Sequence, residues 1–163
     1  MKSETFRIEA MPADVVKRLR ETRVDDVGNA LVTRKDGGRH QCRCCLRLTD
    51  AWEGYLAVSY APMSGSHPFV ERGPVYIHER PCERYREVEQ YPAEMPRTEI
   101  VLRAYGETNE IEDARMVAGT RAEDEIRDLF ANPSIQYIHT RNAAYGCFMF
   151  KIMPARRAAD AGA

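Results

Sequence analysis

The chain has 163 residues, of which 44% are hydrophobic and 30% are charged, a composition typical of a globular protein and not of a disordered one. Its 24 basic and 25 acidic residues give a net charge of −1, so it lacks the basic excess of a dedicated nucleic-acid-binding protein, and no nucleic-acid partner is expected. The apolar runs are only a few residues long, so no membrane-spanning segment is expected. No apolar secretory signal follows Met1, which favours a cytoplasmic location where the five cysteines stay reduced.

The first half of the chain alternates short ordered segments with irregular ones. Alternating polarity predicts a strand at residues 6–9, and the apolar spacing over 15–19 after Pro12 predicts a helix that ends near Thr22. Glycines among charges indicate an irregular connection over 23–41. A further strand is expected to start within residues 44–48. β-Branched and aromatic residues predict two more strands, at 55–60 and 74–78.

The second half indicates a hairpin, a helix and two more strands. Strands are expected at 99–105 and 111–117, joined by a short turn. Thr120 and Glu123 have the spacing of a capping box, which predicts the start of a helix over 121–131. The last two strands are expected at 135–141 and 147–153.

Short turns, and not helices, join most of these strands, which predicts an α+β fold with a mostly antiparallel sheet and one or two covering helices. We expect a single domain over residues 1–154, followed by a frayed C-terminal tail at 155–163.

Cysteine spacing gives the densest chemical signal. Cys42 and Cys45 form a C-x-x-C pair, which lets two thiolates bind one tetrahedral ion and is also the spacing of a redox-active dithiol. One pair is half of a zinc pattern, so the other ligands must come from elsewhere in the chain, where Cys82, Cys147, His78 and His139 are available. We include Cys82 with Cys42 and Cys45 as the expected zinc ligands. The alternative is that these cysteines are small core residues at a strand edge.

A second candidate site lies around the last predicted turn. His139 and Cys147 flank this turn, and a thiol–imidazole pair is geometrically possible if they share a face of the sheet. Cys147 would then be the nucleophile, His139 its base and Asn142 the residue that orients the base. The alternative is an ordinary hairpin with Asn142 as a turn residue and Gly146 in an unusual backbone conformation.

Four short segments carry a resemblance to a known family: Cys42-Arg43 with Leu46-Arg47, Gly73 to His78 with Cys82 downstream, Leu102 to Tyr105, and Tyr137 to His139 with Asn142 and Gly146 to Phe148. From Thr5 to Lys151 the chain resembles an uncharacterised bacterial family known only as a domain of unknown function, number twelve hundred and three. The resemblance implies a compact bacterial single-domain protein whose signature positions include these thiols and imidazoles. Cys44 departs from the pattern, so we do not expect it to be functional.

Two functions fit these observations. In the first, the protein is an enzyme or metalloprotein with a Cys/His site that holds zinc or a reactive thiolate, and Arg43 and His78 bind the substrate. In the second, it is a non-catalytic accessory module that binds a small molecule or a partner protein through a sheet face or the loop over 79–96. The sequence names neither substrate nor reaction.

Overall fold

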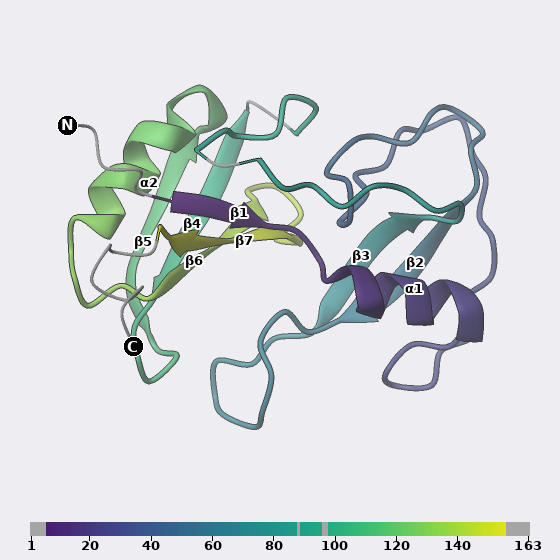
Figure 1. The fold of residues 1–163 in the computed structure, drawn as a ribbon, viewed down its shortest axis with the longest axis horizontal. Coiled ribbons are helices and arrows are strands. Elements are labelled where there is room, and N and C mark those ends of the chain that lie inside the picture. Colours follow the sequence, from purple (N-terminus) through teal and green to yellow (C-terminus); the bar gives the residue numbers. More distant parts are fainter. Residues whose placement is uncertain (1–5, 88, 96–97, 156–163) are drawn as a thin grey trace, which may run out of the picture.

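The computed structural model describes residues 6–87, 89–95 and 98–155, arranged as two sheets with one helix beside each (Figure 1). The elements in chain order are β1 (Phe6–Glu9), α1 (Ala13–Thr22), β2 (Tyr55–Tyr60), β3 (Gly73–His78), β4 (Glu99–Tyr105), β5 (Ile111–Ala118), the 3₁₀ turn η1 (Gly119–Arg121), α2 (Ala122–Phe130), β6 (Tyr137–Asn142) and β7 (Phe148–Pro154). The large sheet has the order β1-β7-β6-β4-β5 with every pair antiparallel, and the small sheet is the antiparallel pair β2-β3.

One face of the large sheet packs against α2. The helix buries Ala122, Ile126 and Leu129, which recur at helical spacing, and its acidic first turn suits the positive end of the helix dipole. Alternate residues of the strands complete this core, among them Leu102 and Ile138.

The other face of the large sheet carries aromatic and charged residues. Tyr105 and Tyr137 stack there with ring centroids 5.0 Å apart, beside the buried ring of His139. The loop between β2 and β3, residues 61–72, lies against this face through Met63 and Val70. We call this loop the strap.

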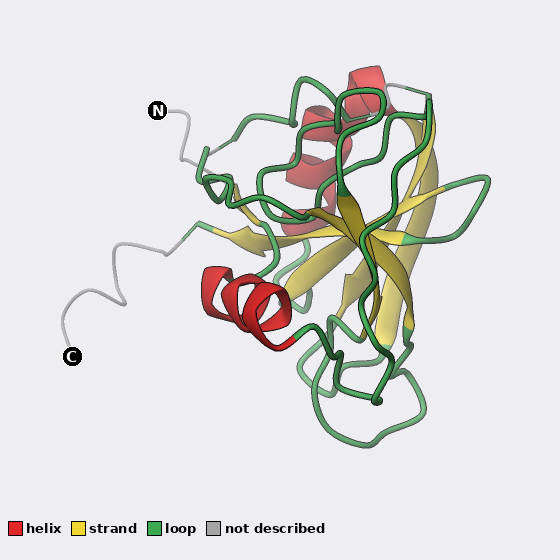
Figure 2. Cartoon of the chain, turned by 90° about the vertical axis from the view of Figure 1, so that its right-hand side faces the viewer, coloured by secondary structure: helices red, strands yellow, loops and turns green. Residues whose placement is uncertain are grey.

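The small half of the molecule has its own core. Val16 and Leu19 of α1 pack against the β2–β3 sheet, together with the cysteine-containing segment that precedes β2. Loops make up much of this half (Figure 2). A two-stranded sheet is marginal alone, so this half depends on α1 and its loops for a core.

The predicted α+β fold with a mostly antiparallel sheet is confirmed. That residues 1–154 form a single domain stays a prediction, because the two sheets have separate cores. The predicted tail at 155–163 lies, apart from Ala155, outside the described residues. Within the described residues, neither helix is long and apolar enough to cross a membrane.

Two local predictions are wrong. The segment 44–48 starts no strand but belongs to a tight turn. Thr120 does not cap the helix, because it lies inside the 3₁₀ turn η1 and Arg121 is the N-cap residue, without a side-chain capping bond. Glu123 instead accepts a hydrogen bond of 2.9 Å from the backbone N–H of Tyr91.

Candidate metal centre

A tight turn presents the C-x-x-C pair. The backbone N–H of Leu46 donates to the carbonyl of Cys42 over 3.0 Å, and the N–H of Cys42 donates to the carbonyl of Arg47 over 2.9 Å. Leu46 takes a left-handed conformation with φ of 55°, which reverses the chain directly after Cys45. Both cysteines therefore point to the same side of the turn, where Cys42 is fully buried and Cys45 nearly so.

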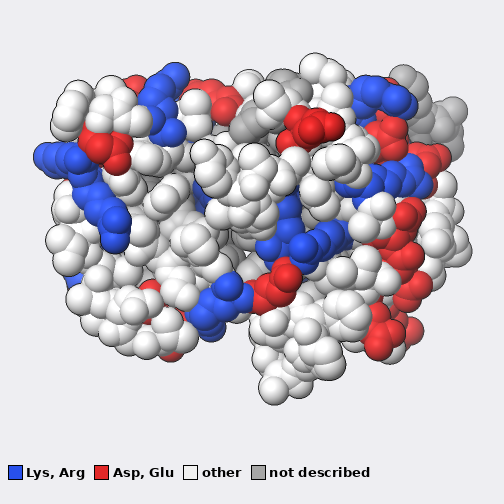
Figure 3. Space-filling model, turned by 180° about the vertical axis from the view of Figure 1, so that it is seen from behind, with Lys and Arg blue, Asp and Glu red and all other residues white. Residues whose placement is uncertain are grey.

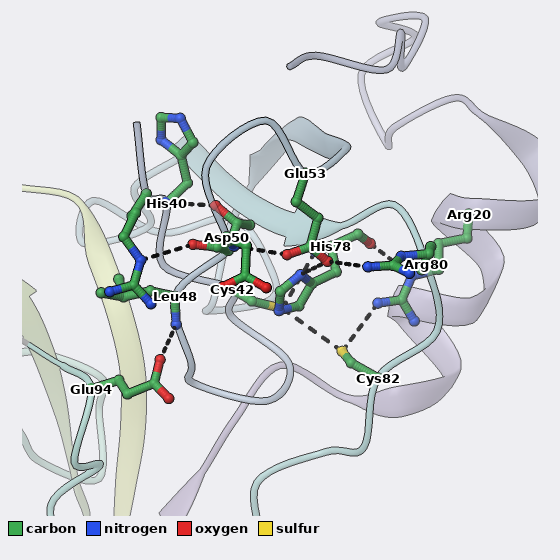
Figure 4. Close-up of polar contacts among 12 residues, drawn as sticks. Arg20, His40, Cys42, Leu48, Asp50, Glu53, His78, Arg80, Cys82 and Glu94 are labelled. Carbon is green, nitrogen blue, oxygen red and sulfur yellow. Dashed lines mark hydrogen bonds and ion pairs between the residues drawn. The ribbon is translucent and has the colours of Figure 1, made fainter. Parts of the chain in front are cut away.

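Cys82 reaches this turn from the segment that follows β3. Its Sγ lies 3.8 Å from the Sγ of Cys42 (Figure 4). The sulfur atoms of Cys42, Cys45 and Cys82 all lie within 4.8 Å of one another. The predicted set of three cysteines is thus brought together from segments that lie 40 residues apart.

Backbone and side-chain N–H groups point at these sulfur atoms. The backbone N–H of His78 donates to Cys42 Sγ over 3.5 Å, and Arg20 Nη2 donates to Cys82 Sγ over 3.2 Å (Figure 4). The backbone N–H groups of Cys45 and Arg47 donate to the sulfurs of Cys42 and Cys45, respectively. Donors directed at sulfur stabilise the thiolate, which is the form that binds metal.

Hydrogen bonds also link the thiols to one another. Hydrogen bonds from Cys42, then from Cys44 and Cys45, hold the pKa of Cys82 far below its usual range, and Arg20 adds to this effect. The same contacts raise the pKa of Cys44, through Cys82, and of Cys45, through Cys42. The cluster therefore favours a thiolate that hydrogen bonds from neighbouring thiols stabilise. Cys44, which we did not expect to be functional, lies beside Cys82 but outside the mutually close set of three.

A carboxylate that the sequence did not reveal lies beside the cluster. Glu53 Oε1 contacts His78 Nδ1 over 3.0 Å and accepts a hydrogen bond from Arg80 Nη2 over 3.2 Å (Figure 4). Burial alone would raise the pKa of Glu53, but the backbone N–H of Asp50, the charge of His78 and Arg80 lower it. His78, Glu53, Cys45 and Cys82 border one open cavity of about 700 Å³. No local pattern marks Glu53, which follows a turn at Trp52 with φ of 66°.

Arg43 joins the two halves of the molecule. It is buried, and it donates from Nε to the carbonyl of Phe148 over 2.7 Å and from Nη1 to the carbonyl of Gln41 over 2.6 Å. Burial lowers its pKa to about 10, while the nearby thiols of Cys147 and Cys42 act in the opposite direction. These two bonds to main-chain carbonyls make Arg43 an anchor, and its predicted role in substrate binding stays a prediction.

The second predicted group is not joined by hydrogen bonds among the described residues. Cys147 Sγ contacts the carbonyl of Tyr145 over 3.9 Å, and neither ring nitrogen of His139 has a hydrogen-bond partner within the described part of the chain. Asn142 Oδ1 accepts hydrogen bonds from the backbone N–H groups of Ala144 and Tyr145, both over 2.9 Å. The turn interpretation is confirmed, with Gly146 at φ of 74°. The catalytic roles of Cys147, His139 and Asn142 stay a prediction without the hydrogen bonds that it requires.

A family model described as "Protein of unknown function (DUF1203)" matches residues 39–154, which include the three clustered cysteines. The chain belongs to this family. The match begins before the cysteine turn and ends with β7. The part of the chain that matches the family model therefore does not include β1, α1 or Arg20. No curated protein and no solved structure matches the chain.

Proposed function

We propose that the protein is a metalloprotein that binds one divalent cation, zinc, through the thiolates of Cys42, Cys45 and Cys82. The observation that carries the proposal is the convergence of three sulfur atoms within 4.8 Å of one another. Zinc–sulfur bonds of about 2.3 Å in a tetrahedron place two sulfurs about 3.8 Å apart. Cys42 and Cys82 already have that separation.

Charge compensation supports a thiolate site. Three thiolates and one divalent cation carry a net charge of −1, which a partly buried site tolerates only with positive neighbours. Arg20 contacts Cys82 directly, and the guanidinium of Arg43 lies near Cys42. These two arginines supply the compensation.

The expected role of the metal is to hold the small half together. The ligands join the turn over 41–47 to the segment after β3, and two of them belong to the small core. A core built on two strands and one helix of 10 residues gains much from a cross-link of this kind. The fourth coordination position would face the cavity that Cys45 and Cys82 border, where water or a ligand could occupy it.

Metal analysis of matched variants tests the proposal. The reduced protein is purified and its metal content measured by mass spectrometry, with one zinc per chain as the expected result. Cys42→Ser, Cys45→Ser and Cys82→Ser should each lose the metal. Cys44→Ser and Cys147→Ser are the matched controls and should keep it, since Cys44 lies outside the mutually close set and Cys147 contacts Tyr145 instead. If all three ligand variants kept the metal, the proposed site would be refuted.

A second candidate function is thiol–disulfide chemistry at the same cluster. The 3.8 Å separation of Cys42 and Cys82 and the lowered pKa of Cys82 favour it. Two thiols would lose two protons and two electrons to an oxidant, for which oxidised glutathione is a suitable probe, and form one disulfide. Its test is the redox titration of the metal-free protein: a Cys42–Cys82 disulfide that forms reversibly supports this function, and alkylation of both thiols after oxidation argues against it.

A further inference from the structure

A cavity of about 370 Å³ lies between the two halves of the molecule, away from the thiol cluster. One wall comes from Tyr60 and Val75 of the small sheet, and the other from Arg141 and Phe148 of the large sheet. Basic side chains gather near the middle of the molecule on the face seen from behind (Figure 3). Ligand pockets measure about 300–1,000 Å³, so this cavity suits a small molecule and not a peptide.

Glu71 and Arg141 line this cavity, and Glu71 also contacts a second arginine, Arg103, on the neighbouring strand. Arg103 on β4 pairs with His139 and Arg141 on β6 pairs with Val101, so both arginines lie on the same face of the sheet. Glu71 of the strap contacts both: its Oε2 lies 2.5 Å from Arg103 Nη1 and 2.7 Å from Arg141 Nη2. The carboxylate of Glu71 thus bridges two guanidinium groups of the large sheet from a loop of the small one.

Two guanidinium groups share one carboxylate at this place on the sheet. Arg103 and Arg141 both contact the one carboxylate of Glu71, whereas Lys151, opposite His139 in the neighbouring strand, lies with its Nζ 4.5 Å from the ring centroid of Tyr137. Arg141 is only 8% exposed, and its Nε is buried without a hydrogen-bond partner among residues 6–87, 89–95 and 98–155. A buried guanidinium with an unused donor and a shared counter-ion favours a further anion.

Apart from Arg72, which donates to the carbonyl of Ser59 over 3.2 Å, the rest of the cavity is mostly apolar and aromatic. The rings of Tyr60 and Phe148 lie 6.0 Å apart, Val75 adds an aliphatic surface, and the side chain of Tyr145 is 85% exposed at the rim. Apolar walls with few converging polar groups are typical of small-molecule sites. Cys147 also lines the cavity and can report on its occupancy.

From these contacts we infer that the cavity binds a small carboxylic acid with an apolar or aromatic body, whose carboxylate takes the place of Glu71 on Arg141 and Arg103. Planar guanidinium groups bind carboxylates through paired N–H donors, and Glu71 already occupies that position. Since Glu71 is about half exposed and belongs to a loop, an external carboxylate can compete with it. None of these residues belongs to the thiol cluster, so this inference does not depend on the metal.

Benzoate is the probe, with the full-length protein and two readouts. Calorimetry gives its affinity, and peptide mass spectrometry gives the rate at which iodoacetamide alkylates Cys147. Benzoate should bind and slow the alkylation of Cys147. Glu71→Gln should raise the affinity about tenfold, because the competing carboxylate is gone. Arg141→Met should lower it at least about tenfold, and Arg103→Gln, which is less buried, is the second variant if Arg141→Met does not fold.

Matched probes and a matched variant separate this site from a general anion effect. Arg18→Gln removes one exposed charge from α1 and should leave the affinity for benzoate unchanged. Acetate should bind more weakly than benzoate, and benzyl alcohol, which has no acid group, should not protect Cys147. Inorganic phosphate that binds as tightly as benzoate would overturn the inference. So would a loss of benzoate affinity in Glu71→Gln, or an affinity that Arg141→Met and Arg103→Gln leave unchanged.

Discussion

His139 gives the protein a specific dependence of stability on pH. Its ring is 1% exposed and lies among the rings of Tyr105, Tyr137 and Phe148, with centroids 4.9, 5.2 and 5.1 Å away. Neither ring nitrogen has a hydrogen-bond partner among the residues that the structure describes. Burial, then the positive charges of nearby arginine and lysine side chains, lower the pKa of His139 from 6.5 to about 3.

The sign of the effect follows from the direction of this shift. In the unfolded chain His139 takes up a proton near pH 6.5, whereas in the folded protein it does so only near pH 3. Between these values the unfolded state binds more protons, so the free energy of unfolding falls as the pH falls. The contribution is fully present above pH 6.5. Lowering the pH from 7.5 to 5.0 removes about 2 kcal/mol of it, because each pH unit below 6.5 costs about 1.4 kcal/mol.

Urea unfolding at pH 7.5, 6.5 and 5.0 measures this loss. His139→Leu keeps a buried apolar side chain at the position and removes the titrating group, so the wild-type protein should lose about 2 kcal/mol more than this variant between pH 7.5 and 5.0. Carboxylates and metal ligands are common to both proteins and cancel in the difference. Phe148→Leu changes the same ring cluster without removing a titratable group and should keep the wild-type dependence. Parallel curves for the wild type and His139→Leu would refute the buried, neutral state of His139.

Three further predictions concern the helix, the metal and the last turn. Ile126→Asp should destabilise the protein by at least about 4 kcal/mol, because it places a charge in the core under α2. Asp124→Ala, at an exposed position of the same helix, should not destabilise it. Circular dichroism during heating measures both variants, and a wild-type melting temperature for Ile126→Asp would contradict the assignment of this helix face. Zinc occupancy should fall as the pH drops from 7.5 to 5, because protons compete for the thiolates of Cys42 and Cys45, and occupancy that stays constant over this range would speak against thiolate ligands. Asn142→Ala should cost about 1–2 kcal/mol because two backbone N–H groups lose their acceptor, and unchanged stability in urea would remove the turn role.

Local sequence patterns were enough to locate the regular elements. β-Branched and aromatic content located β2, the hairpin pattern located β4 and β5 to within a residue, and the apolar spacing over 122–130 located α2. The cysteine turn was misread because its reversal depends on Leu46 in a left-handed conformation, where glycine or asparagine would have given a signal. The capping-box prediction failed because Thr120 lies inside η1, so that α2 begins after Arg121, one residue later than predicted.

The sites divide in the same way. The C-x-x-C spacing predicted the first two sulfur positions, whereas the approach of Cys82 depends on how β3 pairs with the cysteine turn, where Cys42 forms a parallel bridge with Tyr76. The contact of Glu71 with Arg103 and Arg141 could not be predicted, since nothing within the strap indicates which sheet it covers. Contacts between distant segments are set by tertiary packing and leave no periodic trace in the chain.

Arg43 lies where the two sites meet, and this decides which variants can test them separately. Its backbone N–H donates to the carbonyl of Tyr76 in the small sheet, while its Nε donates to the carbonyl of Phe148 in the large sheet. Its charge acts on Cys42 of the candidate metal centre and on Cys147 of the cavity. Replacing Arg43 would leave buried carbonyl groups without a donor and would disturb both sites at once. Loss of metal or of benzoate binding in an Arg43 variant therefore reports on the junction of the two halves. Variants of the proposed cysteine ligands, and variants of Glu71 and Arg141, are needed to assign each function to its own residues.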